Sequence, residues 1–286
     1  MPAPLRQILL LLLALGGSVA SAAGAQSVEA FKRTITKTVG YEYLLSLPTG
    51  YPTAPEVQWP LIVFLHGSGE RGTDPWSVAK HGPPRLIRGD VPLPPPPAGA
   101  ETPVAPVETA AAHAQSEAAA GLLRKNFIVV SPQCPDEQWW DDDTVLALLD
   151  EMAARYRVDP RRVYLTGLSM GGFGTWSLGL KYPERFAAIV PICGGGKPAE
   201  AQRSAEEKRP DLLGLGVWAF HGAQDPAVPV AESARMIAAL KDVGATDVKL
   251  TVYPEAGHDS WTESYANPEL YAWLLQHVRP ALTAAK

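Results

Sequence analysis

The chain has 286 residues, of which 46% are hydrophobic and 19% charged, and its formal net charge is -5. This composition is typical of a folded protein with a large core and excludes a chain that is disordered throughout. The sequence has no run of Lys and Arg that would bind nucleic acid, and two cysteines are too few for a disulfide scaffold.

The first 25 residues have the features of a secretory signal peptide. Arg6 is followed by the apolar run Ile8–Leu15, and two A-x-A cleavage patterns end at Ala22 and Ala25. The run is far shorter than the roughly 20 apolar residues that span a bilayer. The sequence therefore predicts a signal peptide over residues 1–25, no membrane span, and a mature protein that is secreted or periplasmic.

Strand and helix patterns alternate through the rest of the chain. An antiparallel-type strand is expected over 39–47, where apolar and polar residues alternate before a turn. Apolar runs typical of buried parallel strands follow at 61–65, 127–130, 163–166, 187–192 and 217–220, with a strand nearer an edge at 248–252. Helical patterns lie between them at 143–156, 172–181, 231–241 and 268–278. This order predicts an α/β fold with a mostly parallel central sheet and helices on both faces.

Residues 89–120 interrupt the alternation. The segment is rich in proline, including Pro94–Pro97, and then in alanine. Proline-rich sequence favours an extended, poorly packed chain, and the alanine-rich end is compatible with a short helix. Because strands and helices continue on both sides, we interpret the segment as an insertion in one domain over residues 26–286.

A nucleophile motif lies between the strand at 163–166 and the helix that starts at 172. The sequence Gly167-Leu168-Ser169-Met170-Gly171 matches G-x-S-x-G, in which a sharp strand-to-helix turn exposes the serine hydroxyl. The N-terminal N–H groups of the helix also favour negative charge developing there. Ser169 is therefore the expected nucleophile.

A nucleophilic serine needs a base, and that base needs an acid to orient it. His258 follows the strand at 248–252, and Asp225 follows the strand at 217–220. Both lie at carboxyl ends of strands, where α/β sheets gather their functional groups. His258 is the expected base and Asp225 the expected acid.

Other residues near these positions have different expected roles. His66 and His221 each follow a strand and precede glycine, so we expect them to shape turns. Glu255 and Asp259 are rivals to Asp225 for the role of the acid. They flank His258 in the sequence, and such close neighbours rarely point at the ring nitrogen of the histidine.

The negative oxygen that forms during acyl transfer needs two backbone N–H donors. Met170, directly after the nucleophile, is expected to supply one of them. The glycine-rich loop 66–72, after the strand at 61–65, is expected to supply the other from Ser68, with Gly67 or Gly69 as alternatives.

Large aromatic residues lie on several predicted loops. Trp139, Trp140 and Trp261 are candidates to bind substrate, because aromatic faces stack on sugars and aromatic acyl groups. The alternative is that they are packing residues. Residues 141–143 are three aspartates at a predicted helix start. Their negative charge interacts favourably with the helix dipole there, and we prefer this interpretation to a metal site. No metal and no cofactor are expected.

Several motifs together resemble the α/β-hydrolase superfamily. They are His66–Gly72, Ser131–Pro135, Gly167–Gly172, His221–Asp225 and Gly257-His258. The chain most resembles secreted esterases of the polyhydroxybutyrate-depolymerase and feruloyl/acetylxylan-esterase group, and also peptidases of the prolyl-oligopeptidase-like type. The resemblance implies Ser169, Asp225 and His258 as the catalytic triad.

The stretch 197–209 between two predicted strands leaves little room for a large lid domain, so an open cleft is expected. The sequence therefore predicts a secreted serine hydrolase that cleaves small-molecule or polymer-linked carboxylic esters through an acyl-enzyme. Two alternatives are a serine peptidase of the prolyl-oligopeptidase-like type and a non-catalytic hydrolase fold that binds a partner.

Overall fold

The computed structural model describes residues 32–34, 36–93 and 109–280. The predicted signal peptide and residues 94–108 of the predicted insertion lie outside the described residues. From Val39 onward the chain forms one compact unit. The described residues before Val39 contain no helix or strand. None of the helices in the described ranges has the length and apolar character to cross a membrane.

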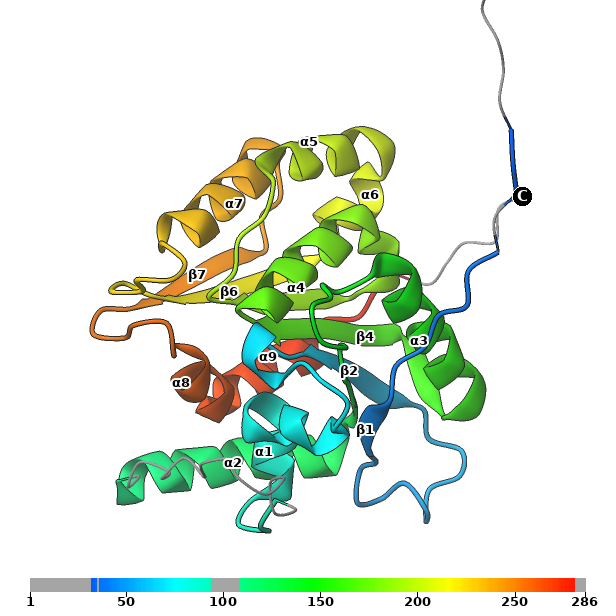
Figure 1. The fold of residues 1–286 in the computed structure, drawn as a ribbon, viewed down its shortest axis with the longest axis vertical. Coiled ribbons are helices and arrows are strands. Elements are labelled where there is room, and N and C mark those ends of the chain that lie inside the picture. Colours follow the sequence, from blue (N-terminus) through cyan, green and yellow to red (C-terminus); the bar gives the residue numbers. More distant parts are fainter. Residues whose placement is uncertain (1–31, 35, 94–108, 281–286) are drawn as a thin grey trace, which may run out of the picture. The chain divides into compact units, whose positions relative to one another are not determined.

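The core of the fold is a seven-stranded sheet (Figure 1). Its strands are β1 (Tyr43–Ser46), β2 (Trp59–Leu65), β3 (Ile128–Pro132), β4 (Val158–Leu168), β5 (Ala188–Ile192), β6 (Gly216–Gly222) and β7 (Val248–Tyr253). The spatial order is β1-β3-β2-β4-β5-β6-β7, and only β1 is antiparallel to its neighbour. The predicted mostly parallel sheet is confirmed, with β4 at its centre and β7 at an edge.

Helices cover both faces of the sheet, as predicted (Figure 1). One face packs against α3 (Asp142–Arg155), α4 (Met170–Lys181), α5 (Pro198–Glu207), α6 (Arg209–Leu213) and α7 (Ala231–Asp242). The other packs against α1 (Gly82–Arg88), α2 (Ala110–Asn126), α8 (Trp261–Ala266) and α9 (Pro268–Gln276). Short 3-10 helices are η1 (Ser68–Glu70), η2 (Pro75–Lys80) and η3 (Pro183–Arg185).

The alanine-rich end of the predicted insertion forms a longer helix than expected. Helix α2 has 17 residues, and the Thr109 hydroxyl caps its start by accepting the Ala112 N–H. Ala119, Ala120 and Leu123 are fully buried on the sheet. Because alanine has the highest helix propensity, this sequence forms a packed helix where the neighbouring prolines suggest loose chain.

Short helices account for the elements that the sequence did not reveal. Helices α5 and α6 occupy the charged stretch between β5 and β6, and each has proline in its first turn. Proline is tolerated there because the first N–H groups of a helix have no intrahelical acceptor. This connection consists of two short helices and not of a lid domain, in agreement with the prediction.

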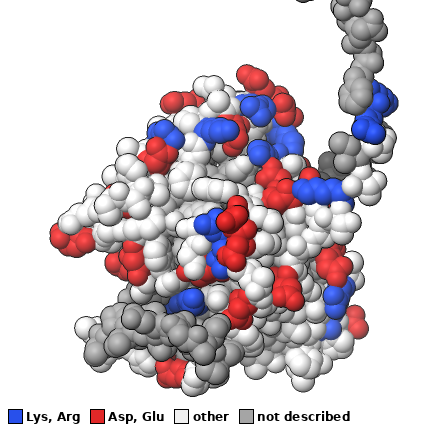
Figure 2. All heavy atoms as spheres, viewed as in Figure 1, with Lys and Arg blue, Asp and Glu red and all other residues white. Residues whose placement is uncertain are grey.

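Acidic and basic side chains are interspersed over the face drawn in Figure 2. The ion pair of Lys181 with Asp142, at 2.8 Å, and that of Lys208 with Glu184, at 2.9 Å, are of this surface kind. Both pairs are only partly buried, and ion pairs so close to solvent contribute little to stability.

Candidate active site

Ser169 lies in a strained turn between the central strand β4 and helix α4. Its φ of 52° is in the left-handed region, which residues with a side chain rarely adopt. Its N–H donates to the Ile192 carbonyl at 3.0 Å. A Cβ on Gly171 would come within 1.9 Å of the Leu65 carbonyl oxygen, so helix α4 can pack this close only with glycine there. The turn lifts the serine side chain above the carboxyl edge of the sheet.

The structure brings Ser169, His258 and Asp225 together in one hydrogen-bonded row. His258 Nε2 is 2.9 Å from Ser169 Oγ, and His258 Nδ1 is 2.7 Å from Asp225 Oδ2. An ionised carboxylate only accepts, so Nδ1 carries the proton and Nε2 is left to accept the serine proton. This arrangement can abstract a proton from a nucleophile.

The Asp225 carboxylate is held by three donors. Besides His258, the N–H groups of Ala227 and Val228 donate to Oδ1 at 2.8 and 2.9 Å. Burial is the largest single influence on the pKa of Asp225 and raises it, but the hydrogen bonds together outweigh burial and leave the pKa below its usual value. The group is therefore an anion at neutral pH.

The two rival acids contact other partners. Glu255 accepts a hydrogen bond from the Gln224 side chain at 3.3 Å. Asp259 accepts from the N–H and hydroxyl of Thr262 at 3.0 and 2.9 Å. The structure thus places Asp225 against the histidine ring and directs both rivals to local turns.

Two buried histidines shape the loops of the site, as expected. His221 Nε2 is 2.8 Å from the Val228 carbonyl, which fixes the loop that carries Asp225. His66 accepts the Cys134 N–H on Nε2 at 2.9 Å, so its Nδ1 carries the proton and donates to the Gly67 carbonyl at 2.6 Å. Burial lowers the pKa of His66 to about 4, which keeps the ring neutral.

Two free N–H groups lie beside Ser169. Met170 is the first residue of α4, and Ser68 is the first of η1. In the described part of the chain, neither N–H donates a hydrogen bond to the protein. Gly67, one alternative donor, gives its N–H to Glu70 Oε2 at 3.0 Å. A Cβ on Gly67 would lie 3.6 Å from Ser169 Cβ, so this loop adjoins the nucleophile.

The three predicted substrate-binding tryptophans have different positions. Trp261 packs edge to face on the His258 ring, with centroids 5.4 Å apart. Trp139 is 62% exposed and packs on Phe173, one turn along α4 from Ser169. Trp140 is buried, and its indole N–H donates to the His66 carbonyl at 3.2 Å. Trp140 therefore packs against the loop that follows β2, which is the packing role left open as the alternative.

Two residues of the site have no role in the sequence-based hypothesis. Glu70 is a buried carboxylate in η1, and His81 precedes α1 and contacts Trp261. A glutamate three residues after a helix cap often binds back to that cap, which is the one sequence signal for Glu70. His81 has no comparable signal, because its partners come from distant parts of the chain.

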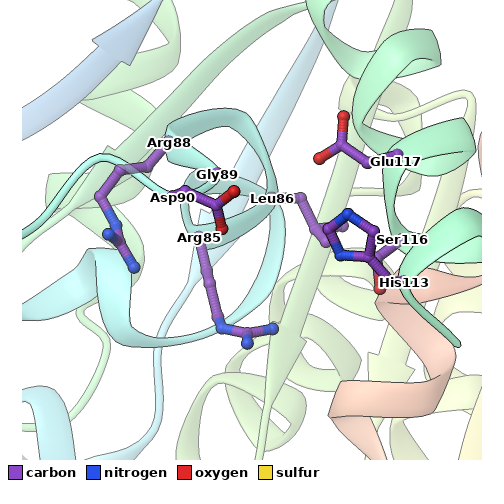
Figure 3. Close-up of a pocket in the computed structure, with 8 residues that line it drawn as sticks. All are labelled: Arg85, Leu86, Arg88, Gly89, Asp90, His113, Ser116 and Glu117. Atoms are coloured by element: carbon purple, nitrogen blue, oxygen red, sulfur yellow. The ribbon is translucent and has the colours of Figure 1, made fainter. Parts of the chain in front are cut away.

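A polar pocket between α1 and α2 is separate from these residues (Figure 3). It is lined by Arg85, Leu86, Arg88, Gly89, Asp90, His113, Ser116 and Glu117. Its lining carries both acidic and basic groups and shares no residue with the row of Ser169, His258 and Asp225.

The aspartates at 141–143 and the two cysteines have contacts that stabilise the fold or bury the side chain. Asp141 accepts the Thr144 N–H at 3.0 Å and so caps α3. Within the described ranges, no group of three or more His, Cys, Asp or Glu residues is placed to hold a metal ion. Cys134 and Cys193 are both buried and free.

Comparisons with known proteins identify a matching family model and several similar proteins. A family model described as Phospholipase/Carboxylesterase matches residues 141–268. The solved structure of a thermostable esterase is 30% identical with a TM-score of 0.61, over 83% of this chain and 59% of the esterase. Poly(3-hydroxyalkanoate) depolymerase C of Paucimonas lemoignei is 44% identical over 52 residues, which are 18% of this chain and 13% of the depolymerase. A bifunctional acetylxylan esterase/xylanase of Neocallimastix patriciarum is 32% identical over 90 residues, 32% of this chain and 12% of that protein.

The chain therefore has the α/β-hydrolase fold, and the predicted resemblance is confirmed. The family description and two of these relatives name carboxylesterases or esterases. The chain spans only part of the length of each of these relatives.

Proposed function

We propose that this protein is a secreted or periplasmic serine hydrolase that cleaves carboxylic esters through an acyl-enzyme. The observation that carries the proposal is the row of Ser169, His258 and Asp225, with successive contacts of 2.9 and 2.7 Å. The esterase matches support the same reaction class.

In the proposed reaction, Ser169 Oγ attacks the ester carbonyl carbon and its proton passes to His258 Nε2. His258 then protonates the alcohol oxygen as the carbon–oxygen bond breaks, leaving an acyl group on Ser169. A water molecule next gives its proton to His258 and attacks the acyl carbon. His258 returns that proton to Ser169 Oγ as the bond between Oγ and the acyl carbon breaks, which releases the acid and restores the serine. Asp225 holds the ring and stabilises the imidazolium that forms twice in this cycle.

The Ser68 and Met170 N–H groups are the proposed oxyanion donors. Both are at helix starts beside Ser169, and neither has an acceptor in the described part of the chain. Donors fixed before the reaction stabilise the developing charge without reorganising, and loss of one such donor typically costs about 100- to 1,000-fold in rate.

The proposed substrate is a small-molecule or polymer-linked ester. Trp261 beside His258 and the exposed Trp139 beside Phe173 offer two aromatic surfaces near the nucleophile. A connection of only two short helices between β5 and β6 leaves room for bulky substrates. The named activities of the depolymerase and acetylxylan esterase relatives involve polymers, in agreement with this proposal.

Replacement of Ser169 by alanine tests the mechanism. We expect Ser169→Ala to lower hydrolysis of a short p-nitrophenyl ester by at least about 1,000-fold. The substitution leaves the strained backbone of the turn as it is, so the thermal midpoint should stay nearly unchanged. Steady-state kinetics and a thermal melt of the same two samples measure both effects.

Matched substrates and a covalent probe separate the rival functions. Full activity of the Ser169→Ala variant would remove the serine from the mechanism. Peptide turnover above ester turnover by the wild-type protein would assign the triad to a peptidase. Failure of a fluorophosphonate probe to label Ser169 would favour the non-catalytic fold.

A further inference from the structure

A row of three side chains joins the loop of Ser68 to the tryptophan beside His258. It consists of Glu70, His81 and Trp261, and we call it the Glu70 bridge. These residues come from η1, the residue before α1, and the first residue of α8. None of them has a chemical step in the proposed reaction.

Glu70 holds the loop directly. Its Oε2 accepts the Gly67 N–H at 3.0 Å, and its side chain is only 9% exposed. The Gly67 N–H is therefore kept away from the site, while the next N–H along the chain, that of Ser68, is left without an acceptor among the described residues. The carboxylate thus sets which N–H groups of the loop are free.

His81 lies between Glu70 and Trp261. Its Nε2 is 3.5 Å from Glu70 Oε1, and its Nδ1 is 3.3 Å from Trp261 Nε1. The rings of His81 and Trp261 pack edge to face, with centroids 5.4 Å apart. The Trp261 ring makes a second contact of the same kind and distance with His258.

The chemistry of the three groups determines which of them donates and which accepts in the Glu70 bridge. An indole nitrogen only donates, so Trp261 donates to His81 Nδ1. The proton of the neutral imidazole is then on Nε2, which faces the carboxylate. Glu70 therefore accepts the Gly67 N–H on one oxygen, and the other oxygen lies 3.5 Å from His81 Nε2.

We propose that Glu70 is a positioning residue. Through His81 it couples the loop 66–72, the oxyanion loop, to the Trp261 side chain that packs on the catalytic histidine, His258. This proposal rests on the proposed function for its catalytic effect. One buried carboxylate thereby fixes the position of the loop after β2 relative to the segment after β7 that carries His258 and Trp261.

An amide cannot replace this carboxylate. In Glu70→Gln one oxygen remains an acceptor, but the other group becomes an NH2 that faces either the Gly67 N–H or the His81 Nε2–H. A buried donor left unpaired in this way is costly. Since the oxyanion loop acts mainly in the transition state, the loss should appear in kcat and not in KM.

Kinetics of Glu70→Gln, His81→Phe and the double variant test the coupling. We expect Glu70→Gln to lower kcat for a short p-nitrophenyl ester about tenfold, with KM within about twofold of wild type. His81→Phe keeps a ring against Trp261 but removes both nitrogens, and should lower kcat about threefold. Because the residues act in one row, the double variant should be no slower than Glu70→Gln alone.

A signal from the Trp261 indole provides a readout that does not need activity. In a nitrogen-15 spectrum, the indole N–H peak missing from Trp261→Phe identifies Trp261. That peak should move in His81→Phe and in Glu70→Gln. Glu151→Gln is the matched control, because Glu151 is an exposed glutamate paired with Arg155 on α3. It should leave the peak, kcat and KM unchanged.

The outcomes are decisive in both directions. Glu70→Gln with wild-type kcat, or with a lower thermal midpoint as its only effect, would overturn the proposal. Independent, multiplying effects of the two changes, or an unmoved indole peak, would do the same. If Glu70→Gln does not fold, His81→Phe decides the matter, because the His81 side chain is 33% exposed and its replacement leaves the core intact. A wild-type protein without esterase activity, but with a moving indole peak, would refute the proposed function and retain the bridge.

Discussion

His66 and His221 show how single side chains hold the loops of this site. Both rings are fully buried at the carboxyl ends of strands, β2 and β6. Each uses its two nitrogens to hold polar groups of a loop: the Cys134 N–H and Gly67 carbonyl for His66, and the Ser233 hydroxyl and Val228 carbonyl for His221. Histidine suits this task because the neutral ring donates with one nitrogen and accepts with the other.

Burial of His66 should make stability depend on pH. Because folding lowers the pKa of the ring from 6.5 to about 4, the unfolded chain takes up the proton first, and the free energy of unfolding falls as the pH drops from about 6.5 toward 4. We expect His66→Asn, which cannot titrate, to reduce the loss of stability between pH 7 and pH 4.5 by about 2 kcal/mol. Urea unfolding at the two pH values measures this.

The control for this experiment is an exposed histidine. His113→Asn, on the exposed side of α2, removes a histidine away from the loops of the site, and its pH dependence is compared with those of His66→Asn and wild type. An equal pH dependence of His66→Asn and wild type would show that the ring is protonated in the folded protein.

At the scale of elements, glycines in two helices have opposite requirements. Gly171 in α4 packs so closely on β2 that a Cβ would lie 1.9 Å from the Leu65 carbonyl oxygen. Gly121 in α2 has open space, with nothing within 4 Å of an added Cβ. The glycine in α4 is needed for the approach of helix to strand, whereas the glycine in α2 only weakens its helix.

Alanine substitutions should separate these two cases. Gly121→Ala should raise the free energy of unfolding by about 0.5–1 kcal/mol, because alanine is the better helix former. Gly171→Ala should lower it severely or prevent folding, since backbone must move. Urea unfolding of both variants provides the comparison, and a destabilised Gly121→Ala variant would contradict the packing described for α2.

The elements that could be predicted from the sequence are those with a strong, continuous signal. Apolar runs at 61–65 and 163–166 predict β2 and the end of β4, and the serine motif predicts the turn between β4 and α4. Helices α1 and α8 have only 7 and 6 residues and give no such pattern. Their residues become important only through packing, which a local pattern does not contain.

At the scale of the molecule, the order of the strands assembles the site. Ser169 follows the central strand β4, while Asp225 and His258 follow β6 and β7 toward one edge. Because these strands are parallel, their carboxyl ends share an edge of the sheet, which is why the sequence could suggest that these three residues meet. The contact between Trp261 and His81 joins positions 180 residues apart and depends on how α8 meets α1, so it could not.

The proposed export and the burial of both cysteines together predict the covalent state of the mature protein. Burial raises the pKa of Cys134 to about 11 and that of Cys193 to about 12, so both remain unreactive thiols. We expect the protein recovered outside the cytoplasm to start at Gln26 and to bind two equivalents of iodoacetamide only after denaturation. Intact mass spectrometry checks both points. A retained Met1 would contradict export by this signal, and a mass lower by two hydrogen atoms would reveal a disulfide.

The separation of the reacting groups along the chain also bears on synthesis. His258 is added 89 residues after Ser169, so a growing polypeptide holds the nucleophile well before it holds the group that accepts the serine proton. Translation itself thus delays the proposed chemistry, because a ribosome-bound intermediate that ends before residue 258 lacks the proposed base.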